Sequence, residues 1–436
     1  MSDKTFDAVV IGSGLGGLTA GALLAQSGYS VCLLERNFSL GGAASVYKVG
    51  PLTVEASLHQ TSDARNPRDV KHDILRRVGI LDEIEWLPTG ALYTVRGGPV
   101  GEAFELPFGF GPAYEALAAR FPDKRAAIQR FLGEVEQIHD ALWTLKQARE
   151  ESSFAKFARG LWELEPAAAG WQNSLHEIME RDFAGCEALK CALGANLAYY
   201  GDDPRRLWWI FYALAQGGYI ASGGAYIKGG SRQLSLKLAK AITKTGGVVR
   251  LGRLVNAIET DSDGAVVAIR HVARRDGEGE ERIAARVVMA NCAPSEAAGM
   301  MDAPARAKME EAFGARKVST SLFAANFGLS AAGKVFDLEP NLGNLVVGQT
   351  LRKILLRRIE IDARIGLRAY SARDLLPPAR VWNTDDSTFG NIIKAAEDVF
   401  DFAWINVAPT ADQHLLQSAG NAQQTVFVDH SQVASP

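Results

Sequence analysis

The residues with the clearest chemical signature form a glycine-rich turn near the start of the chain. Residues 12–17 read GSGLGG and satisfy the pattern GxGxxG. The apolar run 6–11 before the turn predicts a strand, and the run 15–27 after it has helical spacing. Residues 31–35 then predict a second buried strand that ends in an acid. This order of elements is typical of the βαβ unit that binds dinucleotides, which consists of a strand, a glycine turn, a helix and a second strand ending in an acid.

Each part of this turn has a physical role in holding a diphosphate. Gly12 permits the tight turn, Gly14 lets the backbone approach the pyrophosphate, and Gly17 lets the helix and strand close up. The helix N-terminus offers N–H donors to phosphate, and Glu35 accepts a hydrogen bond from a ribose hydroxyl. A glycine turn that binds nothing is the alternative, but the complete βαβ context favours a ligand. The acid at Glu35 disfavours NADP, whereas NAD and FAD share the adenosine half, so the motif alone does not choose between them.

Composition and charge narrow the class of protein. A chain of 436 residues predicts two domains, and 47% apolar residues with 43 glycines indicate a soluble globular protein rich in turns. A formal net charge of -3 gives no basic surface for nucleic acid. The four cysteines match neither a zinc pair nor a redox CxxC, so we predict no metal site. The first residues lack the pattern of a secretion signal, which predicts a cytoplasmic protein.

Between about residue 70 and residue 217 the pattern is mainly helical. Apolar residues recur at three- and four-residue intervals in the segments 72–78, 112–121, 125–149, 174–181 and 187–199. The apolar segment 207–220 is shorter than the roughly 20 residues that a membrane-spanning helix needs, so we expect a core helix there. Its aromatic residues would also suit an apolar ligand channel or a contact with a membrane surface.

Strand patterns return after a glycine-dense loop at 223–230 and a helical run at 233–245. Alternating runs separated by hairpin turn signals then predict an antiparallel meander with strands at 248–260, 265–273 and 282–290. A further strand is expected at 319–329.

A second group of residues follows the βαβ unit: Glu35 and Arg36, then Gly41, Gly42 and Ala43. An acid, a basic residue and paired glycines run along the cofactor in the phytoene desaturase, carotenoid isomerase and retinol saturase family of FAD-dependent oxidoreductases. The sequence resembles this family, which lies within the larger amine-oxidase-like flavoprotein group.

The resemblance continues over about residues 5–330. Residues 49–60 are similar to a family segment that carries an acid and a histidine, here Glu55 and His59. Residues 223–230 resemble the glycine loop between the substrate and flavin domains, and residues 285–294 resemble the strand that returns under the cofactor.

The resemblance implies an α/β fold, with an FAD/NAD(P)-binding Rossmann-like domain of the glutathione-reductase type and an inserted, mostly helical substrate domain. We expect the flavin domain in residues 1–68 and 222–300, the substrate domain in 69–221, and a returning strand region in 301–340. FAD is the implied cofactor, and a carotenoid or retinoid is the implied substrate, undergoing desaturation, saturation or isomerisation by hydride transfer. Such an apolar substrate partitions into bilayers, so we also expect peripheral contact with the inner face of the membrane. Amine oxidation and a non-catalytic protein that binds nucleotide or polyene are the alternatives.

The predicted site follows from the motif and the resemblance. The expected cofactor-binding residues are Gly12, Ser13, Gly14, Leu15, Gly16, Gly17, Glu35, Arg36, Gly41, Gly42, Ala43 and Val255. Residues that would face the flavin or substrate are His59, Tyr226, Lys228, Trp208 and Trp209, and ordinary packing or hydrogen bonding is the alternative for each. No catalytic side chain is assigned, because the isoalloxazine ring itself performs the redox step in flavoenzymes.

Residues 341–436 depart from the family. Its members end with a second flavin segment, a strand followed by a glycine-rich turn and a helix, and nothing in this arginine-rich tail resembles it. Two interpretations stay open for the tail: a divergent domain, or a shifted reading frame that replaced the family's C-terminus.

Overall fold

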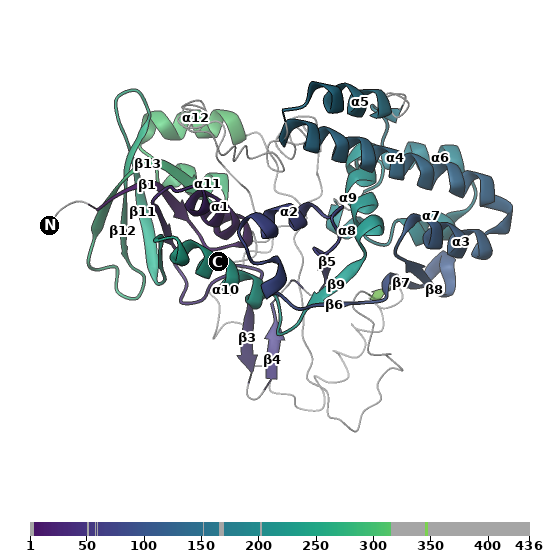
Figure 1. Ribbon diagram of the computed structural model, residues 1–436, viewed down its shortest axis with the longest axis horizontal. Coiled ribbons are helices and arrows are strands. Elements are labelled where there is room, and N and C mark those ends of the chain that lie inside the picture. Colours follow the sequence, from purple (N-terminus) through teal and green to yellow (C-terminus); the bar gives the residue numbers. More distant parts are fainter. Residues whose placement is uncertain are drawn as a thin grey trace, which may run out of the picture.

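The structure is a computed structural model that describes residues 4–49, 52–56, 58, 60–150, 152–164, 170–200, 203–314 and 345–347. The strand expected at 319–329, residue His59 and most of the tail at 341–436 therefore lie outside the described residues. Figure 1 shows a mixed sheet with its covering helices at one end of the molecule and a group of helices at the other.

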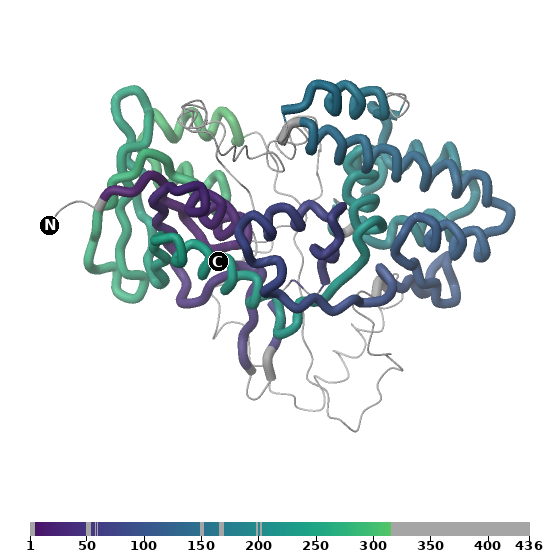
Figure 2. Tube along the Cα trace, in the orientation of Figure 1, coloured from purple at the N-terminus to yellow at the C-terminus, as the bar shows by residue number. Residues whose placement is uncertain are grey.

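A six-stranded sheet forms the core of the first part. Its strand order is β10 (Val248–Arg250), β2 (Val31–Leu34), β1 (Lys4–Ile11), β13 (Glu281–Ala290), β12 (Val266–Ala273) and β11 (Arg253–Thr260). The first four strands are parallel, and β12 and β11 continue the sheet in antiparallel pairing. Figure 2 shows the purple N-terminal chain beside the green chain of β13. The predicted βαβ unit and α/β class are confirmed.

Apolar side chains cover both faces of this sheet, which explains why β1 and β2 read as continuous apolar runs. On one face, Val10 and Leu33 pack against helices α1 (Leu15–Gln26) and α10 (Arg232–Lys244). On the other face, Val9 and Leu34 join a second apolar cluster that includes residues of the two antiparallel strands. The parallel strands are thereby fixed in position beneath the glycine turn.

The predicted meander needs a correction at its first strand. The run 248–260 is two strands, because Gly252 turns the chain with φ of +66° and donates its N–H to Asn37 O at 3.0 Å. Residues 248–250 therefore extend the parallel sheet as β10, and only β11, β12 and β13 form the antiparallel meander.

A small antiparallel sheet lies between the two parts of the molecule. It consists of β5 (Thr61–Ser62), β9 (Gly224–Ile227) and β6 (Trp86–Pro88). The glycine-dense segment 223–230, which the sequence predicted as a loop, thus contains a strand that pairs on both edges. A hairpin of β3 (Val46–Val49) and β4 (Leu52–Glu55), also not predicted, leads toward this sheet.

The segment contains the helices expected between residues 70 and 217, with four differences, the first being a helix at 154–164 that was not predicted. Helix α2 (Val70–Arg77) packs on the first part, because its Leu75 lies in the same apolar cluster as α1 and α10. The other helices lie at α3 (Phe110–Arg120), α4 (Arg125–Glu150), α5 (Phe154–Leu164), α6 (Leu175–Phe183), α7 (Glu187–Leu193), α8 (Leu197–Tyr200) and α9 (Trp209–Ser222). The segment 187–199 is two helices that break at Gly194, and the helix expected at 207–220 begins at Trp209. Strands β6, β7 (Ala91–Gly97) and β8 (Gly101–Pro107) were not predicted, and β14 (Leu345–Val347) pairs with β7.

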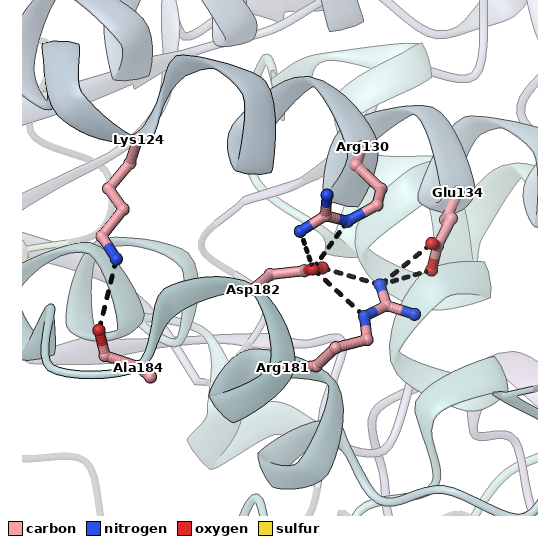
Figure 3. Close-up of polar contacts among 6 residues, drawn as sticks. All are labelled: Lys124, Arg130, Glu134, Arg181, Asp182 and Ala184. Carbon is pink, nitrogen blue, oxygen red and sulfur yellow. Dashed lines mark hydrogen bonds and ion pairs between the residues drawn. The ribbon is translucent and has the colours of Figure 1, made fainter.

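The helical part is held together by a mainly apolar core and by a buried ionic contact between α4 and α6. Phe131 of α4, Phe183 of α6 and Trp209 of α9 meet in the core, with ring centroids 5.1 Å apart in both contacts of Phe131. Nearby, the fully buried carboxylate of Asp182 accepts hydrogen bonds from Arg130 and Arg181, which fastens α6 to α4 (Figure 3). Among the described residues, no helix is both long and apolar enough to cross a bilayer.

Candidate dinucleotide-binding site

The glycine turn lies at the carboxyl ends of the parallel strands, where the chain changes direction across the sheet. From β1 the chain moves to one side for β2 and β10, and β13 adds to the other side of β1. Ligands of open α/β sheets bind outside the carboxyl ends of the strands at such a switch point. The described residues that surround this point come from the glycine turn, the end of β2, the turn at 41–44 and the end of β13.

The turn requires glycine at two positions for steric reasons. Gly12 has φ of +95°, donates its N–H to Leu34 O at 2.8 Å, and would place a Cβ 2.8 Å from Asn291 O. A Cβ on Gly17 would lie 2.2 Å from Gly12 O, so any side chain there would push α1 away from β1. These contacts give the physical basis for the roles predicted for both glycines.

Helix α1 begins in a form suited to an anion. Its N-cap is Gly14, which makes no side-chain cap hydrogen bond, and the first turn from Leu15 contains no acidic residue. Unpaired N–H groups and the positive end of the helix dipole favour a negative group at such a terminus.

The carboxylate of Glu35 is buried and fixed by the turn itself. Its Oε2 accepts hydrogen bonds from Ser13 N at 2.8 Å and from Ser13 Oγ at 2.6 Å, and its Oε1 accepts one from Asn37 N at 2.6 Å. A carboxylate has about four lone-pair sites, so Oε1 keeps the capacity to accept a ribose hydroxyl. The partnership of Ser13 with Glu35 was not predicted, although both residues were assigned to the site.

The backbone around Glu35 connects the site to Val255 and Arg36. Glu35 N donates to Arg250 O at 2.9 Å, and Arg253 N donates to Glu35 O at 2.8 Å. Two residues on, the side chain of Val255 is buried among core residues, so a ligand could meet only its backbone, at a register irregularity of β11. Arg36 is half-buried, with its guanidinium 3.9 Å from the carboxylate of Glu296 in α11 (Pro294–Gly299).

The second glycine pair folds back onto the first turn, a contact that the sequence analysis did not predict. Gly41 N donates to Ser13 O at 3.0 Å, and Gly14 forms a parallel bridge with Gly41. Gly41 and Gly42 have φ of +106° and +56°, conformations that glycine adopts without strain. The segment through half-buried Ala43 is held from the other side by Ser235 of α10, whose hydroxyl donates to Ala44 O at 3.0 Å.

A residue that was not assigned to the site lies directly against the turn. Asn291 follows β13, donates its N–H to Ile11 O at 2.7 Å, and has its Oδ1 2.8 Å from the position of a Cβ on Gly16. Both polar atoms of its side chain are buried without a hydrogen-bond partner among the described residues. An unsatisfied buried polar group costs about 1–3 kcal/mol. The signal in the sequence was the polar residue that ends the apolar run at the predicted cofactor strand.

The residues expected to face the flavin or substrate have packing or ion-pair partners. Lys228 is exposed and pairs with Glu85 at 2.8 Å, while Tyr226 is half-exposed and its phenol pKa is raised by burial and by Glu55. Trp209 is buried in the helical core, and half-buried Trp208 donates its indole N–H to Trp171 O. Their assignment to a substrate site stays a prediction.

Glu55, the acid of the second segment that resembles the family, supports the start of α10. Its Oε2 accepts a hydrogen bond from Ser231 N at 2.9 Å, and its Oε1 accepts one from Ser231 Oγ. A negative charge at the first turn of a helix is stabilising. The carboxylate thereby joins the β3–β4 hairpin to the helix that packs against α1.

Gly17→Ala is expected to lose dinucleotide binding, because its methyl group would lie 2.2 Å from Gly12 O. We expect FAD affinity, measured by quenching of flavin fluorescence, to fall by at least about tenfold, which corresponds to about 1.4 kcal/mol. The matched control is Gly133→Ala in α4, where nothing lies within 4 Å of the added Cβ. That change should raise the free energy of unfolding by about 0.5–1 kcal/mol and leave FAD affinity unchanged. Equal affinity in the two variants would contradict this account of the turn.

The free energy of unfolding is expected to fall at acid pH because of His271, which lies in the sheet beside Val255. This fully buried histidine pairs with Val255 across β11 and β12, and burial lowers its pKa below the ordinary value of 6.5. Below that value the unfolded chain binds a proton that the folded chain does not, so stability falls as the pH falls. We expect His271→Leu to lose less free energy of unfolding than the wild type between roughly pH 7 and pH 5 in urea titrations. Parallel pH profiles would contradict the lowered pKa.

Comparison with known proteins identifies the family. A family model described as "Flavin containing amine oxidoreductase" matches residues 15–326. Curated relatives include the all-trans-retinol 13,14-reductase of Rattus norvegicus, 26% identical over 274 residues, and the phytoene desaturase (neurosporene-forming) of Rhodobacter capsulatus, 27% identical over 271 residues. These alignments cover 61% and 60% of this chain but 44% and 49% of the relatives. The chain therefore spans less than half the length of either relative.

A solved structure agrees on the fold. The oxidoreductase from Methanosarcina mazei is similar with a TM-score of 0.50 and 17% sequence identity, over 71% of this chain and 65% of that protein. The family match covers more than half of the chain and includes the last three residues of the turn, Glu35, the second glycine pair and Asn291. The chain belongs to the flavin-containing amine oxidoreductase family.

Proposed function

We propose that this chain is an FAD-dependent oxidoreductase that exchanges hydride with an apolar polyene of the retinoid or carotenoid class. The proposal rests on the arrangement of residues at the switch point, which we call the cradle. There the glycine turn, the fixed carboxylate of Glu35 and the turn at Gly41 meet. The names of the relatives support the substrate class, since one is a retinol reductase and another a phytoene desaturase.

The residues of the cradle suit the adenosine half of FAD. The start of α1 would bind the pyrophosphate, Glu35 would accept a ribose hydroxyl through Oε1, and Val255 would contact the nucleotide through its backbone. When bound, FAD supplies hydride exchange at its isoalloxazine ring, while the protein supplies binding and orientation. No side chain is required to carry the redox step.

The proposal is tested on the purified full-length chain by absorption spectroscopy, with and without added FAD. We expect flavin bands, and we expect all-trans-retinol or phytoene supplied in vesicles to change redox state or double-bond geometry only when flavin is bound. Chromatography of the extracted polyene provides the measurement.

Other outcomes select the alternatives. Amine turnover with release of peroxide would favour an amine oxidase. A colourless protein that FAD cannot reconstitute would overturn the flavoenzyme proposal and favour a non-catalytic binding protein.

We further propose that the protein contacts the bilayer that holds such a substrate, and that helix α5 makes the contact. Phe154 and Trp162 are 83% and 80% exposed, and Phe157 and Leu161 are also exposed. With about 3.6 residues per turn, these side chains share one face of the helix. The helix packs against α4 through Gly160, where a Cβ would lie 2.7 Å from Leu145 Cγ, and Leu164 at its C-terminal end is buried.

The composition of α5 is typical of a helix that lies in a membrane interface. Arg159 is strongly exposed at the edge of the apolar face, where it pairs with Glu163 at 2.6 Å, and Lys156 lies on the same helix. Cationic side chains beside an apolar face with tryptophan and phenylalanine favour an interface that contains anionic lipid. Figure 1 shows α5 at the periphery of the molecule, above α4. The segment 207–220, considered for this role from the sequence, has its largest side chains in the core.

The double substitution Phe154→Ser/Trp162→Ser is expected to reduce co-sedimentation with vesicles of mixed zwitterionic and anionic lipid about tenfold or more, because it removes two large apolar side chains from the contact. The matched control is Leu236→Ser/Val267→Ser, whose side chains are 38% and 37% exposed on other elements. The control should sediment like the wild type.

Equal recovery of the wild type in the soluble fraction with and without vesicles would overturn the membrane contact. A dimer that the α5 substitutions dissociate would instead assign this face to a second copy of the chain.

A further inference from the structure

The side chain of Asn291 has a position that packing alone does not explain. It is 94% buried at the end of β13, yet neither its Oδ1 nor its Nδ2 has a hydrogen-bond partner among the described residues. Buried amides are almost always hydrogen-bonded, and an exception calls for a specific cause. The backbone of the residue is already satisfied, because its N–H donates to Ile11 O.

The surroundings of Asn291 are the glycines of the phosphate-binding turn. The position of a Cβ on Gly17 lies 3.1 Å from Asn291 Cβ, and that on Gly16 lies 2.8 Å from Asn291 Oδ1. The amide thus lies over the first turn of α1, at the switch point between β1 and β13. A small apolar side chain would fill this space without leaving polar atoms unpaired.

Neighbouring side chains offer no alternative partner of suitable chemistry. Cys292 follows Asn291, and burial raises the pKa of its thiol to about 12, so it stays neutral. The carboxylate of Glu35 accepts hydrogen bonds from Ser13 and Asn37, and none from the amide of Asn291. A ligand group that accepts hydrogen bonds at the start of α1 would satisfy the amide.

We propose that Asn291 is a cofactor-binding residue whose Nδ2 donates a hydrogen bond to the pyrophosphate of the dinucleotide. Phosphate oxygens accept hydrogen bonds and do not donate them, so the amide presents its NH₂ group to the ligand. The inference rests on the proposed function and adds a contact from β13 to those from α1 and β2. In this proposal the side chain of Asn291 strengthens dinucleotide binding, but it lowers the stability of the ligand-free protein because its polar atoms are then unpaired.

The test separates these two effects in the full-length chain. Asn291→Leu removes the amide at similar volume, and Asn291→Asp keeps the shape but brings a carboxylate to the phosphates. We measure thermal unfolding without ligand, and the affinities for FAD and for ADP, which shares the adenosine and pyrophosphate groups of FAD. The matched control is Asn196→Leu, since Asn196 is also buried with an unpartnered Oδ1 but lies between α7 and α8.

We expect Asn291→Leu to bind both FAD and ADP about tenfold more weakly, and Asn291→Asp more weakly still. The unfolding temperature of ligand-free Asn291→Leu should equal or exceed that of the wild type, because an unsatisfied amide is removed. Asn196→Leu should bind both ligands like the wild type.

Three results would overturn the inference. If Asn291→Leu binds both ligands with wild-type affinity, Asn291 makes no contact with them. If only the affinity for FAD falls, Asn291 contacts the flavin half of FAD and not the pyrophosphate that ADP shares. A loss of affinity that accompanies a lower unfolding temperature of the ligand-free protein would make the role structural. By contrast, a wild-type chain that binds neither FAD nor ADP would reject the proposed function itself.

Discussion

The structure of the site depends on how closely helix α1 approaches strand β1. Gly12 and Gly17 permit this approach because neither carries a side chain, and a methyl group on the second would overlap the carbonyl oxygen of the first. With α1 at this distance, its N-terminus points over the ends of β1 and β13, and Ser13 reaches the carboxylate of Glu35. The acid that we propose to bind the ribose is therefore oriented before any ligand arrives, which would reduce the conformational entropy lost on binding.

Local patterns predicted the parts of the site that are contiguous in sequence. The turn at 12–17, the helix after it and the acid that follows β2 all obey rules of spacing, so their positions in the structure match expectation. The assignment of Gly41 to the cofactor came from family resemblance, and its contact with the turn was not predicted, because no local rule states which glycines will meet. For Asn291 the sequence showed only a polar residue at the end of an apolar run, and its importance depends on two missing hydrogen bonds that only coordinates reveal.

The errors in the fold have a common physical cause. Strand β9 lies in a glycine-dense segment and β6 has only three residues, and both are strands because they pair with each other. The division of 248–260 depends on Gly252, whose turn is fixed by a hydrogen bond to Asn37 more than two hundred residues earlier. Short strands owe their existence to partners distant in sequence, which residue preferences do not encode. Aromatic residues in the sequence likewise did not reveal which helix is buried, because Trp209 is buried while Trp162 is exposed.

The pairing of β1 with β13 has a consequence for biosynthesis. Lys4 is aligned with Ile283 in this parallel pair, so the first strand of the protein leaves the ribosome long before its partner exists. Domains that fold during synthesis generally do so from the N-terminal end, but here one edge of β1 stays unpaired until residue 290 has emerged. An apolar strand with an open edge is prone to join other chains. The nascent protein therefore passes through a long interval in which this edge is open to pairing with other chains.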